Sequence, residues 1–157
     1  MLTASALAAA SLGTAGCATL DAASAAARVP PDVTVLRAAI AAKAAMIARY
    51  TATAAAYPRL RPGLGPLLGD HHAHLAELQH RLVEPAHPAP GLGPPSARPA
   101  TPVPSSEGAA VAALVSAERA AAAQHVAQLR SATPSLAQLF ASIAACEATH
   151  VTALGTL

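Results

Sequence analysis

The chain has 157 residues, of which 54% are hydrophobic, 11% are charged and 2% are aromatic. Alanine favours helices, and the β-branched and aromatic residues that are typical of strands are sparse. This composition excludes a sheet-based fold and predicts one Ala-rich helical domain with a tail. The net charge of +2 is spread along the chain without a basic cluster, so we expect no nucleic acid partner.

Residues 1–18 are small and apolar, as in the hydrophobic region of a bacterial export signal, and the run is short for a transmembrane helix. Thr14-Ala15-Gly16-Cys17 is similar to a lipobox, in which cleavage before the cysteine leaves that residue to carry lipid. Two features depart from the pattern, because Thr14 stands where Leu is usual and no Lys or Arg precedes the apolar run. We predict a signal peptide, lipidation of Cys17 and an extracytoplasmic location on the cell membrane; the alternative is an ordinary N-terminal helix.

A tether over residues 19–32 leads to a first helix over 33–56, which ends before Tyr57-Pro58 because a residue that precedes proline disfavours helical geometry. Its apolar face has helical spacing and is formed by Leu36, Ile40, Ile47 and Tyr50. Lys43 falls within this face, where an unpaired charge is costly.

A second helix is predicted from Pro62 or Pro66 to about residue 83, with a leucine-rich face. His71 and His74 interrupt the centre of that face. Four other polar residues lie at its edge or outside it: Asp70, His72, Glu77 and His80. Three histidines are expected to be surface residues: His72, His80 and His87.

The composition changes abruptly between Glu84 and Glu107, a segment with eight of the fourteen prolines in the chain. Proline lacks a backbone N–H, so this segment forms neither helix nor sheet. About fifty residues on either side are too few for two independent cores, so we interpret the segment as a crossover within one bundle rather than a linker between domains. Its extended length of about 70 Å exceeds the height of a helix and would leave the second and third helices parallel.

The third helix is predicted to start after residues 105–107, whose serines suit an N-cap, and to end near Arg130. Glu118 and His125 lie within its apolar face. After a short turn, Pro134 suits the first position of a fourth helix.

Glu147 and His150 are three residues apart in the fourth helix, so their side chains project from one face about a turn apart. They lie within an apolar stripe formed by Leu136, Leu139, Phe140, Ile143 and Leu154. The neighbouring Cys146 is expected to be a small core residue rather than a ligand.

Two interior polar residues from each helix are expected to converge at the middle of the bundle: Lys43, Tyr50, His71, His74, Glu118, His125, Glu147 and His150. The two halves of the chain repeat the same spacings. Lys43 and Tyr50 are seven positions apart, as are Glu118 and His125. In the second helix of each half, the two residues are three positions apart.

With these residues the chain resembles the ferritin-like superfamily, in the style of the ferritin-like domain lipoproteins of actinobacteria. That family places Glu, Glu-x-x-His, Glu and Glu-x-x-His on four helices, with a long connection between the second and third. Glu118 and Glu147-Ala-Thr-His150 match the second half of the pattern, whereas Lys43 and His71 stand where the first half has glutamates. Over residues 33–157 the resemblance implies an all-α four-helix bundle of the ferritin-like type with a long Pro-rich crossover. Tyr50 matches a tyrosine that many ferritins carry beside the metal.

The departures from the family pattern argue against a di-iron centre, which needs about four carboxylates. We therefore expect a non-catalytic bundle with a degenerate metal site and no cofactor, in which Lys43 is the internal cation and Tyr50 and His125 complete the network. Its partners would be the membrane, through the lipid anchor, and an envelope protein or a second copy of the chain. The alternative is a metal-binding or redox protein that holds one divalent iron, zinc or copper ion. Its ligands would come from Glu118, Glu147, His150, His71 and His74.

Overall fold

The computed structural model describes residues 31–82 and 102–157. Within these ranges the chain forms four long helices, α2 (Pro31–Ala56), α3 (Arg61–Arg81), α4 (Glu107–Gln128) and α5 (Pro134–Leu154), and a 3-10 turn, η1 (Pro58–Leu60), with no strand. The all-α class and the four predicted helices are confirmed. The predicted signal peptide with Cys17, residues 19–30 of the predicted tether and the segment that includes His87 lie outside the described residues. The last two residues of the predicted tether, 31–32, instead begin α2. None of the described helices is long and apolar enough to cross a membrane.

The ends of the first hairpin follow local sequence rules. Helix α2 ends at Ala56, directly before Tyr57-Pro58, as predicted. Helix α3 begins at Arg61, after η1, and includes Pro66 in its early turns. Its start therefore lies slightly before the predicted one.

The starts of α4 and α5 were also predicted from their capping residues. The Ser106 hydroxyl accepts a hydrogen bond from the backbone N–H of Ala109 at 3.3 Å, which caps α4. Pro134 is the first residue of α5, where its missing N–H costs no helical hydrogen bond.

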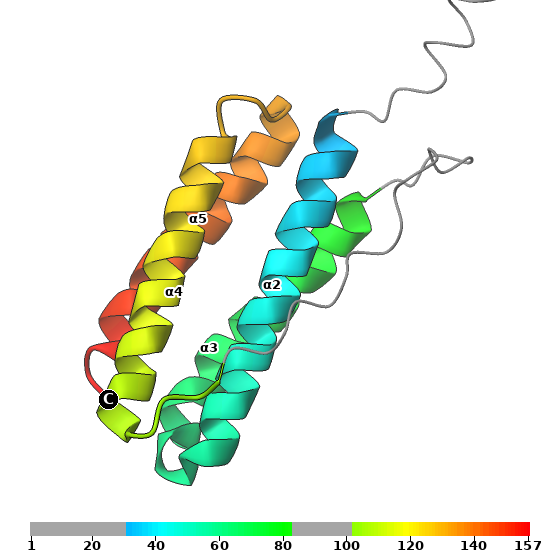
Figure 1. Ribbon diagram of the computed structural model, residues 1–157. Helices are drawn as coiled ribbons and strands as arrows, with labels where there is room; N and C mark the ends of the chain where they lie inside the picture. Colours follow the sequence, from blue (N-terminus) through cyan, green and yellow to red (C-terminus); the bar gives the residue numbers. More distant parts are fainter. Residues whose placement is uncertain (1–30, 83–101) are drawn as a thin grey trace, which may run out of the picture.

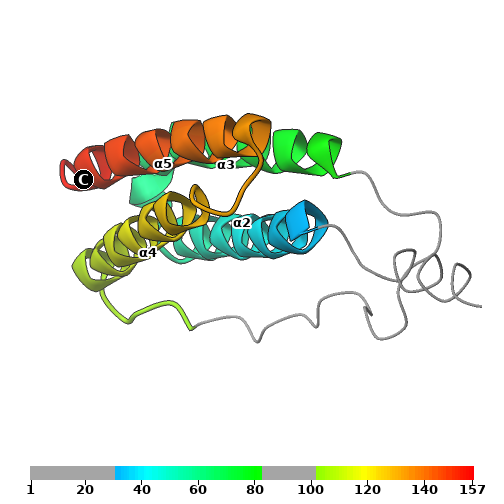
Figure 2. The same cartoon turned by 90° about the horizontal axis from the view of Figure 1, so that it is seen from above.

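The helices form two antiparallel hairpins, α2 with α3 and α4 with α5, that pack side by side (Figure 1). Helix α2 also contacts α4, and α3 also contacts α5. Figure 2 shows α3 and α5 at one level and α2 and α4 at the other. Helices α3 and α4 run in the same direction (Figure 1), as the predicted crossover requires, but the crossover itself stays a prediction.

Two apolar clusters occupy the two ends of the bundle. One consists of Met46, Tyr50, Leu60, Leu64, Leu67, Leu114 and Leu154. The other consists of Leu36, Ala39, Leu78, Leu136, Phe140 and Ile143. Along α2, α3 and α5, buried polar residues lie between the contributions to the two clusters, so the polar groups form a layer enclosed at both ends by apolar side chains.

Candidate functional site

The predicted interior polar residues meet in this middle layer. Seven of them are at most 4% exposed: Lys43, Tyr50, His71, Glu118, His125, Glu147 and His150. His74 is half-buried. Because burial makes an unpaired charge costly, the contacts among these side chains decide what the layer can do.

Glu118 is the acceptor at the centre of one half of the layer. The Tyr50 hydroxyl and His71 Nε2 donate to its Oε1 at 2.5 and 2.7 Å. His150 Nδ1 lies 3.4 Å from the same oxygen, within ion-pair distance but without hydrogen-bond alignment. Burial alone would raise the pKa of Glu118, but its contacts with His150, His71 and Tyr50 outweigh burial and lower that pKa to about 2. Glu118 is therefore a carboxylate at neutral pH.

The two donors to Glu118 are neutral groups. Burial, together with the neighbouring carboxylate, raises the pKa of Tyr50, so its hydroxyl keeps its hydrogen. Burial lowers the pKa of His71, although Glu118 opposes the shift. His71 then carries its hydrogen on Nε2, toward Glu118, and its Nδ1 faces Lys43 Nζ at 3.5 Å.

Lys43 and Glu147 form the other half of the layer. Lys43 Nζ donates to Glu147 Oε1 at 2.5 Å, and both side chains are almost fully buried. Burial raises the pKa of Glu147, and the positive charge of Lys43 opposes that shift. His125 Nε2 lies 3.8 Å from the same oxygen, too far for a hydrogen bond. Lys43 is thus the main partner of Glu147.

His125 is held mainly by packing. Its ring stacks on Phe140 with a centroid distance of 5.1 Å, and its Nδ1 lies 3.3 Å from the Gln128 side-chain oxygen. Burial lowers the pKa of His125 to about 4 and that of His74 to about 4, so both rings are neutral near pH 7.

Four buried polar atoms of the layer have no hydrogen-bond partner among the described residues: His74 Nδ1, Glu118 Oε2, Glu147 Oε2 and His150 Nδ1. Each buried carboxylate thus uses one oxygen and leaves the other without a partner. These four atoms are therefore the buried groups of the layer that keep unused hydrogen-bonding or ligating capacity.

His150 also contacts two residues that the sequence did not single out as site residues. Asp70 Oδ2 and Cys146 Sγ lie 3.2 and 3.4 Å from its Nε2. The expectation that Cys146 is a core residue is wrong, because its side chain is only half-buried. Its position four residues before His150, on the same helix face, is the signal that could have revealed the contact. Burial alone would lower the pKa of His150, but Glu118 and Asp70 outweigh burial and raise it.

Two groups of side chains within the described ranges have ligand atoms less than 4.8 Å apart: His71 with Glu118 and His150, and Asp70 with Cys146 and His150. The first contains three of the five predicted metal ligands. The other two, Glu147 and His74, belong to neither group. Glu147 instead faces Lys43, which is a cation of the protein itself. His72 and His80 are exposed, as predicted.

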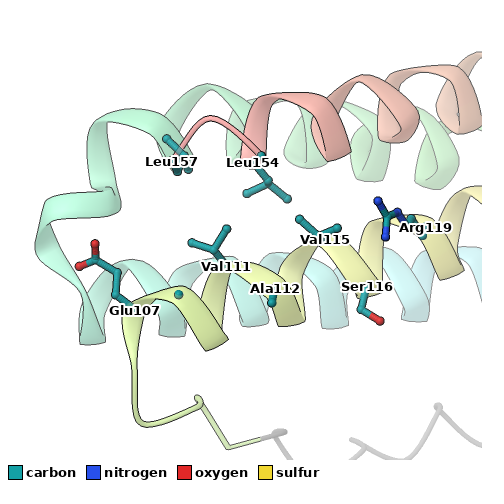
Figure 3. A pocket seen from close by; sticks show the side chains of 10 residues that line it. Glu107, Val111, Ala112, Val115, Ser116, Arg119, Leu154 and Leu157 are labelled. Carbon is teal, nitrogen blue, oxygen red and sulfur yellow. The ribbon is translucent and has the colours of Figure 1, made fainter.

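An open pocket of about 450 Å³ lies between the start of α4 and the end of α5 (Figure 3). Its apolar wall includes Val111, Val115 and Leu154, and the charged Glu107 and Arg119 also line it. None of the lining residues belongs to the buried polar layer, so this pocket gives no access to it.

No family model matches the chain, and no curated protein or solved structure matches it either. The class of protein is therefore defined by geometry: an all-α four-helix bundle with a buried layer of carboxylates, imidazoles, one lysine and one tyrosine.

Proposed function

We propose that this protein is an exported, lipid-anchored bundle of the ferritin-like type with a non-catalytic role. In this proposal Lys43 provides the positive charge that a metal ion provides in a ferritin-like site. Cys17 carries the lipid, and the bundle presents its helical surface to an envelope protein or to a second copy of the chain. The polar layer then specifies how the helices pack and carries out no reaction.

The contact between Lys43 Nζ and Glu147 Oε1 at 2.5 Å is the observation that carries the proposal. A divalent ion bound by Glu147 would lie next to the lysine ammonium, and like charges at such a distance repel strongly in a buried environment. Lys43 already neutralises one of the two buried carboxylates. His150, whose raised pKa favours its charged form, lies beside the other, Glu118.

The internal cation is tested by the metal content of purified full-length protein after exposure to iron, zinc and copper, measured by elemental mass spectrometry. The comparison is between the parent and Glu147→Gln, because the amide keeps the shape of the side chain and removes the charge. We expect the two proteins to retain the same amount of metal. Loss of a stoichiometric ion in Glu147→Gln would show that Glu147 is a ligand and would overturn the proposal.

The lipid anchor is tested separately in cells. A Cys17→Ala variant should leave the membrane fraction, whereas the parent should remain in it. An unchanged membrane fraction would remove the anchor from the proposal without affecting the internal cation.

A second candidate function is a metal-binding or redox protein with one divalent ion in the core. The unpartnered Glu118 Oε2, next to His71 and His150, favours this function because it leaves a carboxylate oxygen free within a group of ligands. Binding would require Lys43 to move or to lose its proton. Glu118→Ala would abolish the retained ion in this case, and a metal content that does not change in Glu118→Ala would exclude an ion held by Glu118 in the core.

A further inference from the structure

Three side chains of different chemistry meet at the edge of the polar layer, where α3 lies beside α5. Asp70 comes from α3, and Cys146 and His150 lie one turn apart on α5. Their ligand atoms are all within 4.8 Å of one another. We propose that Asp70, Cys146 and His150 bind one zinc ion, Zn²⁺, through a carboxylate, a thiolate and an imidazole. This site is separate from the Lys43–Glu147 pair and adds to the proposed function.

The distances within the group suit tetrahedral coordination. Zinc bonds to oxygen, nitrogen and sulfur of about 2.0–2.3 Å place neighbouring ligand atoms about 3.3–3.6 Å apart in a tetrahedron. His150 Nε2 lies 3.2 Å from Asp70 Oδ2 and 3.4 Å from Cys146 Sγ. The two distances from His150 Nε2 therefore match the edges of such a tetrahedron, and the ligand atoms of Asp70 and Cys146 lie within 4.8 Å of each other.

The orientation of the His150 ring points to a ligand rather than to hydrogen bonding alone. Its Nε2 can carry one hydrogen, yet two ligand atoms face this nitrogen. On the opposite side of the ring, Nδ1 lies 3.4 Å from Glu118 Oε1. This pair is not aligned as a hydrogen bond, but it has the arrangement in which a carboxylate behind a metal-bound histidine commonly fixes the ring, so that the other nitrogen faces the ion.

Charge balance also favours metal binding at Asp70, Cys146 and His150 over metal binding in the core. When Zn²⁺ binds, the Cys146 thiol releases its proton, so the thiolate and the Asp70 carboxylate together supply two negative charges to the ion. These charges balance the ion and leave Lys43 paired with Glu147. The core alternative instead adds the ion next to that lysine.

The site is open to solvent. The Asp70 side chain is 54% exposed, and Cys146 is half-buried, so an ion reaches the group from outside the bundle. Three protein ligands leave the fourth tetrahedral position to water. Thiolate and imidazole ligands select zinc over magnesium or calcium, which prefer oxygen.

The test uses Co²⁺ as a spectroscopic probe on the reduced full-length chain with a Cys17→Ala background, which leaves Cys146 as the only thiol. We expect one Co²⁺ per chain, with the visible absorption of a tetrahedral site and a thiolate-to-cobalt charge-transfer band. Added Zn²⁺ should remove both signals. Cys146→Ser should abolish the charge-transfer band, and Asp70→Asn should weaken Zn²⁺ binding. Far-ultraviolet circular dichroism verifies that each variant is folded, and the exposed position of Asp70 makes Asp70→Asn the variant least able to disturb the core.

Two control variants separate this site from other sources of binding. His72→Gln removes an exposed imidazole of the same helix and should leave the cobalt spectrum unchanged. Glu147→Gln should also leave it unchanged, whereas Glu118→Gln should weaken binding by about 10- to 100-fold through the His150 ring.

Three results would overturn the zinc site: no charge-transfer band in the parent, a band that survives Cys146→Ser, or a band that is lost in His72→Gln. Metal binding that is abolished by Glu147→Gln but retained in Cys146→Ser would place the ion in the core. That result would refute both the zinc site and the internal cation. If the charge-transfer band is absent and Glu147→Gln retains as much metal as the parent, only the zinc site is refuted.

Discussion

The two hairpins contribute opposite kinds of groups to the polar layer. The α2–α3 hairpin supplies the donors Lys43, Tyr50 and His71, and the α4–α5 hairpin supplies both buried carboxylates, Glu118 and Glu147. Each carboxylate takes its closest partner from the other hairpin. Neither hairpin alone can satisfy its own buried polar groups, so the layer specifies that the two hairpins pack together and in which register.

Removal of the one buried ammonium should have the largest effect on this pairing. Lys43→Met keeps most of the volume of the side chain but leaves the Glu147 carboxylate buried without its 2.5 Å partner. We expect a loss of about 3–5 kcal/mol in the free energy of unfolding, because an uncompensated buried charge is strongly destabilising. Urea denaturation followed by circular dichroism measures it.

The double variant Lys43→Met/Glu147→Gln provides the control for this loss. With both charges removed, most of the stability should return, since a neutral pair leaves no isolated charge in the core. A double variant that is no more stable than Lys43→Met would show that the two residues are not coupled.

Loss of the Tyr50 hydroxyl should be the next largest effect. Tyr50→Phe removes a 2.5 Å donor from the Glu118 carboxylate in the other hairpin, and we expect a loss of about 1.5–3 kcal/mol because the acceptor is charged. Tyr57→Phe is the matched control, since its hydroxyl donates to the neutral Pro104 carbonyl and should contribute only about 1 kcal/mol. Equal losses in the two variants would contradict a special role for Glu118.

The buried imidazoles should make the pairing of the hairpins sensitive to acid. The pKa of His125 falls from 6.5 in the unfolded chain to about 4 in the folded chain. Between pH 6.5 and 4, His125 is therefore protonated in the unfolded chain but neutral in the folded chain. Stability should therefore fall as the pH drops from 6.5 to 4, by about 1.4 kcal/mol per pH unit for this residue. Half-buried His74, with a pKa lowered to about 4, should add a smaller loss of the same sign. His150 acts in the opposite direction because its pKa is raised in the fold. It stabilises the folded chain below pH 6.5, and this stabilisation is lost as the pH rises through the raised pKa.

The unfolding free energies of the parent and His125→Gln, measured from neutral to acidic pH, test this slope. The variant should be less dependent on pH over the same range. Parallel curves for the two proteins would show that His125 is not held neutral by the fold.

An exposed contact between the same hairpins should contribute least to the free energy of unfolding. Arg81 on α3 donates to Ser135 at the start of α5 and to Glu77, both at 2.7 Å. Because water and salt screen exposed charges, Arg81→Ala should cost at most about 1 kcal/mol in the same denaturation assay. A loss as large as that of Lys43→Met would show that burial does not explain the difference between the two contacts.

Much of the fold could be predicted because it depends on local signals. The start of α4 follows from Ser106, the start of α5 from Pro134 and the end of α2 from Tyr57-Pro58, each of which acts on the few residues next to it. The prediction of the start of α3 was less accurate. Proline usually marks a helix start, but Pro66 lies inside this helix. Leu64 and Leu67, on either side of Pro66, are buried in the core although Pro66 cannot donate a backbone hydrogen bond.

The residues of the site could be predicted only in part. Helical spacing placed Lys43, Glu118 and Glu147 in the interior, and all three are buried. It did not show that Asp70 reaches His150, because Asp70 lies on the exposed edge of α3 and meets His150 only where α5 packs beside it. Helical spacing also did not show that Cys146 is only half-buried. Cys146 is next to the buried Glu147, and one residue of helical rotation is enough to change the burial of a side chain.

The sequence by itself determined the four helices, most of their limits and most of the polar side chains that face the interior, since periodicity and capping are properties of each helix alone. Only the tertiary structure decided the partners that belong to different helices: Lys43 with Glu147, Tyr50 and His71 with Glu118, and Asp70 with His150. Most of these contacts join residues distant in the chain, and their distances depend on how far each helix is rotated and shifted against its neighbours. That geometry is set by the packing of the apolar clusters at both ends of the bundle, which no single helix specifies.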